Sequence, residues 1–315
     1  MNLLEKGARH ARDLVKRVKH SVTPGTAGGG HTESALYCYG VWMRHLVGCC
    51  DHAQLEVPSA VAEIGPGRSL GTCLAAILSG ANHAWAFDHI RYVDLQENVT
   101  VLDELIRLFQ CRAPIPDERV LPRVFPALSS YEFPRHILTD DRLAAALVPA
   151  RLAAIRRALE GERGGDVLID YIAPWDPSVK VPDCLVDLVF SQAVMLYVRD
   201  LEEAYAAMRG WLRPGGAMSH TINFTSIGIV PSWDGHWNYD DDNWLAIEGI
   251  QPYRISRHPY SMHVQAMKAA GLGIAHVASE TAAPSTSRDR LAKRFDNLSD
   301  EDRTTARAFM IARCL

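Results

Sequence analysis

Residues 60–80 have the sequence "AVAEIGPGRSLGTCLAAILSG", and this stretch decides the fold. A short apolar run ends at a Gly-Pro-Gly elbow, and a helix-like run follows at once. Short apolar runs closed by Gly and Pro are typical of buried strands. Glycine lets another group approach the backbone closely. The stretch therefore predicts a strand, a tight turn and a helix, and leaves open whether the turn meets a phosphate, another cofactor or the neighbouring strand.

The same alternation continues along the chain. Strands are expected at 59–64, 83–89, 165–173, 185–192, 216–224, 273–279 and 304–315. Helices are expected at 34–50, 68–80, 93–109, 200–212 and 261–271. Strands that alternate with helices of this length indicate an α/β fold, with a mostly parallel sheet covered by helices on both faces.

Three segments fall outside this alternation. Residues 1–30 predict a basic amphipathic helix, of charge about +4, followed by a glycine-rich hinge. Such a helix docks on the body of the protein, on a membrane surface or on a partner. Residues 111–165 and 225–260 are long connections inside the domain spanning 31–315, and long connections are often functional.

Composition narrows the class of protein. The chain has 315 residues, 48% of them hydrophobic, and a formal net charge of -4, which argues against nucleic-acid binding through a broad basic surface. No apolar run is long enough to span a membrane, and the N-terminus lacks the apolar region of a signal peptide. The seven cysteines are scattered without a C-x-x-C pair. We therefore expect a cytoplasmic protein with free thiols and no metal centre.

The residues around the elbow discriminate between its possible ligands. A phosphate-binding P-loop requires a lysine that is absent here, and a dinucleotide fingerprint requires glycine where Leu70 stands. Glu63 precedes Gly65 by two residues, and its carboxylate would repel a pyrophosphate but attract an ammonium or sulfonium group. Asp88 ends the second expected strand, where a carboxylate can accept both hydroxyls of a ribose.

Three motifs in this order, "EIGPG", "AWAFDH" and "VDLVFSQ" with the later "LRPGGAMSHTINF", resemble those of the class I S-adenosylmethionine-dependent methyltransferases. The resemblance covers residues 60 to about 280. It implies a Rossmann-like sheet of seven strands, in which the last strand is antiparallel and lies beside the fifth. The N-terminal helices and both insertions would form a lid.

The resemblance implies S-adenosylmethionine as cofactor and assigns residues to it by position. The methionine part would meet Glu63, Gly65, Pro66, Gly67 and Ser69, although most members have glycine where Ser69 stands. Other parts of the cofactor would meet Asp88, His89, Ile90, Tyr171, Trp175, Ser191, Gln192 and Ala193. The helix before the first strand would close over the cofactor and bring Tyr39 and Arg44 to it.

A closer resemblance links the chain to a bacterial subgroup associated with polysaccharide or small-molecule pathways. It rests on "ESALYCYGVWMRHL", "SHTINF", "WDGHWNY" and "RHPYSMH". Asn223 stands where an aspartate is common in that subgroup. The expected reaction is O-methylation of a small molecule or carbohydrate, by a monomer or a homodimer.

Histidine suits the removal of a hydroxyl proton because its ordinary pKa is near neutrality. His236 is the expected general base, and His220 is either a second candidate or an interior residue. The acceptor would meet Asn223, Trp237, Tyr239, Arg254, Arg257, His258 and His263. N- or C-methylation of a natural product, a nicotinamide-dependent oxidoreductase and a non-catalytic cofactor-binding protein remain alternatives.

Overall fold

The computed structural model describes residues 31–175, 185–249 and 253–314. It contains a seven-stranded sheet with the order β3-β2-β1-β4-β5-β7-β6. The strands are β1 (Ala60–Ile64), β2 (His83–Phe87), β3 (Leu168–Ile172), β4 (Val186–Gln192), β5 (Leu212–Asn223), β6 (Leu272–Thr281) and β7 (Thr305–Cys314). The predicted helix over 1–30 lies outside the described residues.

The pairing of the strands makes the sheet mostly parallel. β1 runs parallel to β2 and β4, and the same direction continues into β3 and β5. β7 runs antiparallel to both of its neighbours, β5 and β6. The predicted seven-stranded α/β sheet, with an antiparallel last strand beside the fifth, is therefore confirmed.

One strand boundary was predicted wrongly. β5 begins at Leu212 instead of residue 216, because Leu212 already pairs with Val186. A register shift then separates this pair from the next, Leu188 with Ala217. The Arg-Pro-Gly-Gly segment, expected as a turn after the helix, thus belongs to an irregular part of the strand.

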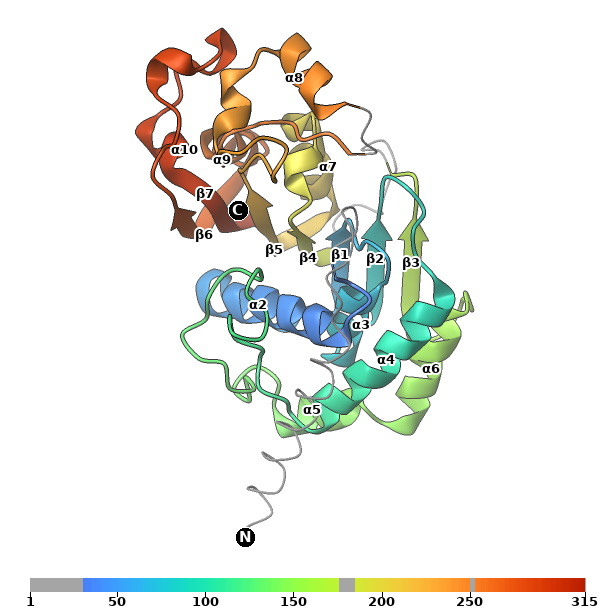
Figure 1. Cartoon of the computed structure of the whole chain (residues 1–315). Coiled ribbons are helices and arrows are strands. Elements are labelled where there is room, and N and C mark those ends of the chain that lie inside the picture. The colour runs from blue at the N-terminus through green and yellow to red at the C-terminus, as the bar shows by residue number, and fades with distance from the viewer. Residues whose placement is uncertain (1–30, 176–184, 250–252, 315) are drawn as a thin grey trace.

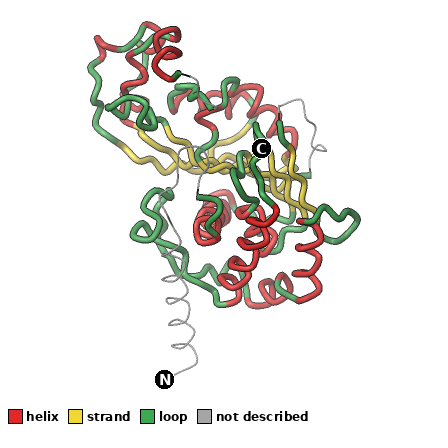
Figure 2. The backbone as a smooth tube through the Cα atoms, turned by 45° about the vertical axis from the view of Figure 1, so that its right-hand side comes forward, coloured by secondary structure: helices red, strands yellow, loops and turns green. Residues whose placement is uncertain are grey.

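Helices cover both faces of the sheet (Figures 1 and 2). On one face lie α2 (Ala35–Ala53), α3 (Gly71–Leu78), α4 (Leu95–Gln110), α5 (Asp140–Ala146) and α6 (Pro149–Leu159). On the other side lie α7 (Leu201–Trp211), α8 (Asp241–Glu248), α9 (Tyr260–Ala269) and α10 (Asp300–Thr304). Short 3₁₀ helices are η1 (Met195–Tyr197), η2 (Gly235–Asn238), η3 (Arg288–Arg290) and η4 (Lys293–Phe295). No helix within the described ranges is long and apolar enough to cross a membrane.

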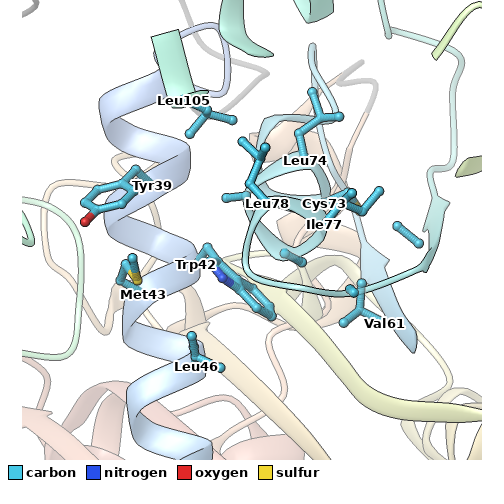
Figure 3. Close-up of a cluster of buried hydrophobic side chains, with 14 of the residues drawn as sticks. Tyr39, Trp42, Met43, Leu46, Val61, Cys73, Leu74, Ile77, Leu78 and Leu105 are labelled. Carbon is cyan, nitrogen blue, oxygen red and sulfur yellow. The ribbon is translucent and has the colours of Figure 1, made fainter. Parts of the chain in front are cut away.

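Local sequence signals explain where the helices begin. Ser34, Asp94 and Asp200 cap α2, α4 and α7, each accepting a hydrogen bond from a backbone N–H in the first turn. The apolar side of α2 then packs on α3, where Trp42 is completely buried and its indole N–H donates to Ser79 Oγ at 2.8 Å (Figure 3). This contact fixes α2 against the C-terminal end of α3.

The proline-rich insertion is held by α2, which corrects one prediction. Arg44 is buried and donates to the carbonyls of Gly40, Pro116 and Pro126 at 2.8–2.9 Å. The hydroxyl of Tyr39 donates to the carbonyl of Ala113 at 2.5 Å. The predicted role of Tyr39 and Arg44 in cofactor binding is therefore wrong, because this side of α2 faces the insertion.

Candidate active site

A cavity of about 1110 Å³ lies at the carboxyl edge of the sheet. The strand order reverses between β1 and β4, and open α/β sheets bind ligands at such a point. The structure brings several predicted site residues together here: Glu63, Gly65, Gly67, Asp88, His89, Trp175, Gln192, Ala193, Asn223 and Arg254.

Glu63 contributes a buried carboxylate at the end of β1. Its residue is only 3% exposed, and its Oε2 accepts a hydrogen bond from Cys73 Sγ at 3.1 Å. Burial raises the pKa of Glu63 to about 7, against the opposing effect of hydrogen bonds from Cys73 and Thr72. The carboxyl group is thus poised to ionise when a cation approaches.

The elbow after Glu63 requires glycine. Gly65 has φ +71°, and a Cβ atom there would lie 2.4 Å from Val194 Cγ2. Gly67 has φ +75°, and its Cβ would lie 3.0 Å from Thr32 Oγ1. Residues other than glycine rarely adopt this backbone conformation. Their side chains would also fill the space between the elbow and its neighbours.

Asp88 ties the elbow to the end of β2. Its two carboxylate oxygens accept hydrogen bonds from the backbone N–H groups of Gly67 and His89, at 3.3 and 2.7 Å. Burial raises the pKa of Asp88. Because β1 and β2 are adjacent and parallel, Glu63 and Asp88 both present carboxylates to one cavity.

The segment before α2 covers the elbow, which the sequence did not predict. Thr32 Oγ1 accepts from the backbone N–H groups of Arg68 and Ser69, at 3.0 and 3.3 Å, and Ser69 Oγ donates to the Thr32 carbonyl. The side chain of Ser69 therefore binds the protein's own backbone, and Ser69 is not among the residues described as lining the cavity. His31, Thr32 and Tyr37 line it instead.

An aromatic group next to Asp88 was also missed. The ring of Tyr253 lies 5.6 Å from that of Tyr197 and 6.4 Å from that of His89, measured between centroids. All three residues line the cavity, and they come from three separate segments, of which the one that contains Tyr197 is η1. Single aromatic residues in loops carry no pattern, so only the fold identifies them.

The far end of the cavity is formed by the last strands. The register places Asn223 of β5 opposite Arg307 of β7, and Arg307 opposite Glu280 of β6. Arg307 and Glu280 form an ion pair. Arg123 from the proline-rich insertion and Arg199 after η1 line the same cavity. The sequence indicated Asn223 and Arg254 for the acceptor but none of the other arginines.

Other residues assigned to the cofactor support the site without lining it. The hydroxyl of Tyr171 donates to the Ile90 carbonyl at 3.2 Å and accepts from the N–H of Tyr92 at 3.0 Å. Ser191 Oγ lies 2.8 Å from His220 Nδ1 inside the sheet. Pro66, Tyr171 and Ser191 are not among the described lining residues.

The two predicted bases do not reach this cavity. His236 lies in η2, only 1% exposed, with its ring 4.6 Å from that of Trp237. Burial, together with the charge of Arg257, lowers the pKa of His236 to about 3. His220 is completely buried within β5, and burial lowers its pKa to about 3 as well. The geometry thus gives no support to either histidine as the general base.

Several residues assigned to the acceptor hold other parts of the protein together instead. Arg257 donates to the carbonyls of His236 and Tyr239, pairs with Asp241 and accepts through its own carbonyl from the indole N–H of Trp237. His263 is buried, with Nδ1 3.0 Å from the hydroxyl of Tyr205. His258 Nε2 lies 2.9 Å from the Arg199 carbonyl. None of Trp237, Tyr239, Arg257, His258 and His263 is among the described residues lining the large cavity.

The buried histidines predict a loss of stability in acid. His45, His220 and His236 are neutral in the folded protein because burial lowers each pKa to about 3, whereas an unfolded histidine titrates near 6.5. The unfolded state therefore binds more protons below pH 6.5, so the free energy of unfolding decreases as the pH falls from about 6.5 to about 3. The raised pKa of Glu63 acts in the opposite direction between 4.5 and about 7, as does the raised pKa of Asp88, but these are two groups against three.

Urea denaturation between pH 8 and pH 4.5 measures this effect. We expect His220→Asn to reduce the number of protons taken up on unfolding by about one, and so to flatten the dependence of the free energy of unfolding on pH. The exposed control His136→Asn should leave that dependence unchanged. A stability that stays constant from pH 8 to pH 4.5 would contradict the prediction.

Comparisons with known proteins place the chain beside solved methyltransferase structures. No family model and no curated protein matches it. An S-adenosylmethionine-dependent methyltransferase from Mesorhizobium loti is 16% identical, with a TM-score of 0.38 and coverage of 82% of this chain and 92% of that one. A S-adenosylmethionine-dependent methyltransferase from Methanosarcina mazei is 11% identical, with a TM-score of 0.44 and coverage of 84% and 96%. A geranyl diphosphate methyltransferase in complex with S-adenosylmethionine is 12% identical, with a TM-score of 0.43 and coverage of 92% and 93%. Independently of these similarities, the seven strands and the antiparallel β7 beside β5 are those that the resemblance to class I S-adenosylmethionine-dependent methyltransferases implies.

Proposed function

We propose that the protein is an S-adenosylmethionine-dependent methyltransferase that methylates a hydroxyl oxygen of a small molecule or carbohydrate. One observation carries the proposal: two buried carboxylates, Glu63 and Asp88, face one cavity from the ends of adjacent strands, with the Gly65–Gly67 elbow between them. This pair matches a ligand with an ammonium group at one end and a ribose in the middle.

The residues present fit such a cofactor. The carboxylate of Glu63 would face its ammonium group, and that of Asp88 would accept hydrogen bonds from the ribose hydroxyls. His89 and Trp175 line the part of the cavity next to Asp88 and suit the flat adenine ring. The cavity of about 1110 Å³ exceeds the upper range of about 1,000 Å³ for small-molecule sites, which leaves space for an acceptor. When bound, S-adenosylmethionine supplies a methyl group activated by its sulfonium.

Alignment is the main task left to the protein in this reaction. Gln192 and Ala193 end β4 beside Glu63, and Ala193 adopts φ +56°, a strained conformation of the kind found at functional sites. Asn223, at the end of the neighbouring β5, would orient the acceptor hydroxyl. This proposal does not give His236 the role of general base, because His236 is not among the described residues that line the cavity.

Of the alternative functions, the nicotinamide-dependent oxidoreductase is the least consistent with these residues. A nicotinamide dinucleotide would bring its pyrophosphate to the elbow, where the buried Glu63 would repel it. An N- or C-methyltransferase would bind the cofactor in the same part of the cavity and would differ only in its acceptor. A non-catalytic protein would bind the cofactor without transferring the methyl group.

Calorimetry with S-adenosylhomocysteine, S-adenosylmethionine and NADH tests the proposal. We expect the first two to bind and NADH not to bind. Asp88→Asn should weaken S-adenosylhomocysteine about 10- to 100-fold, because a hydrogen bond to a charged group contributes about 1.5–3 kcal/mol. Asp103→Asn, the same change on the outer side of α4, is the control. Binding of NADH without binding of S-adenosylhomocysteine would refute the proposal.

A further inference from the structure

Four arginines line the large cavity: Arg123, Arg199, Arg254 and Arg307. Arg307 lies on β7, four strands away from β2 in the sheet, which corresponds to roughly 19 Å at about 4.8 Å per strand. Its Nη1 donates to the Arg123 carbonyl at 3.2 Å, so Arg123 belongs to the same end. Arg123 and Arg307 therefore place positive charge at the end of the cavity away from Asp88, whereas Arg254 directly follows Tyr253, whose ring lies 6.4 Å from that of His89.

Most of this charge lacks an internal counterion. Arg307 pairs with Glu280. Within the described ranges, no carboxylate forms an ion pair with Arg123, Arg199 or Arg254, and the side chain of Arg254 makes one long hydrogen bond, 3.4 Å from Nη2 to the Gly249 carbonyl. Guanidinium groups of like sign around one space repel each other until an anion enters.

A second, smaller cavity adjoins the first at two of these arginines. It has a volume of about 430 Å³, and Arg199 and Arg254 line both cavities. The other arginines of the smaller cavity, Arg257 and Arg294, are each paired with Asp241. The two guanidinium groups without a carboxylate partner thus stand at the junction, where a group of an acceptor bound in the first cavity would reach them.

We propose that the acceptor carries a carboxylate or phosphate group, which Arg199 and Arg254 bind at this junction. The inference rests on the proposed methyltransferase function and names the class of its substrate. Guanidinium groups form paired, charge-assisted hydrogen bonds with both anions. The anionic group is an anchor, and the hydroxyl to be methylated lies nearer to Gln192 and Asn223.

The test measures anion binding to the protein saturated with S-adenosylhomocysteine. Inorganic phosphate and benzoate are titrated separately by calorimetry at low salt, and the tighter probe indicates which anion the junction prefers. We expect at least one probe to bind, and the Arg199→Gln/Arg254→Gln protein to bind it at least tenfold more weakly. Arg254→Lys, which keeps the charge, should retain more affinity than Arg254→Gln. Raising the ionic strength should weaken binding to the unmodified protein.

Two controls separate the possible failures. Arg135→Gln removes the same charge from an exposed ion pair in the proline-rich insertion and should leave anion binding unchanged. Affinity for S-adenosylhomocysteine, measured on every variant, should not change and shows that each one is folded. If S-adenosylhomocysteine binds but neither anion does, or if the double variant binds anions as the unmodified protein does, the anionic acceptor is refuted and the methyltransferase proposal stands. If S-adenosylhomocysteine does not bind to the unmodified protein, the methyltransferase proposal itself fails.

Discussion

Replacing Gly65 by alanine is expected to lower the free energy of unfolding by about 2–5 kcal/mol, combining about 1–2 kcal/mol for the left-handed backbone with about 1–3 kcal/mol for overpacking. The backbone cost arises because Gly65 has φ +71°. The packing cost arises because the new Cβ would lie 2.4 Å from Val194 Cγ2 and 2.9 Å from Val194 Cγ1. Urea denaturation at pH 7.5 measures the change.

A second glycine isolates the contribution of the backbone. Gly161 has φ +90°, and a Cβ atom there would meet nothing within 4 Å. Gly161→Ala should therefore cost only the backbone part, about 1–2 kcal/mol. Adding Val194→Ala to Gly65→Ala should recover part of the packing cost. Equal costs for Gly65→Ala and Gly161→Ala would show that the contact with Val194 has no energetic weight.

The affinity for S-adenosylhomocysteine should depend on pH through Glu63. In the free protein, burial raises the pKa of Glu63 to about 7, and the ammonium group of the ligand favours the ionised carboxylate. Binding below pH 7 therefore releases a proton, and the affinity should fall by about tenfold for each pH unit below 7. Above pH 7 it should be constant until the ligand's own ammonium group titrates. Calorimetry at pH 5.5, 6.5, 7.5 and 8.5 measures this dependence.

A ligand without the amino-acid tail provides the matched control. 5′-Methylthioadenosine keeps the ribose and adenine but has no ammonium group. Its affinity should therefore not fall tenfold for each pH unit below 7. Glu63→Gln should remove the dependence for S-adenosylhomocysteine and leave 5′-methylthioadenosine unaffected, whereas Asp88→Asn should weaken both ligands. An unchanged pH dependence in the Glu63→Gln protein would assign the titration to another group.

The cofactor end could be predicted from the sequence because its determinants are local. A glycine elbow directly after a buried strand, and a carboxylate at the end of the next strand, fix their own positions once the strands pair side by side. Glu63, Gly65, Gly67 and Asp88 all line the cavity for this reason.

The acceptor end depends on contacts between distant segments, so the sequence left it undetermined. Arg123 reaches the cavity because α2 binds the proline-rich insertion through Arg44, and Arg307 reaches it because β7 runs antiparallel. His236 was misassigned because a histidine between tryptophans in a loop suggests a binding surface, whereas these aromatic rings form a small core of the lid. Whether a loop residue faces a ligand or its own lid depends on packing that local patterns do not encode.

The position of β7 has a consequence for how the chain is made. β7 contains the last strand residues of the chain but pairs with β5 on one side and β6 on the other. Until Thr305–Cys314 has left the ribosome, β5 and β6 both present unpaired strand edges, which favour association between chains. A stop codon before residue 305 would therefore leave the edges of β5 and β6 unpaired. It would also leave the acceptor end of the cavity incomplete. We expect such shortened products to aggregate during synthesis rather than accumulate as a weakened enzyme.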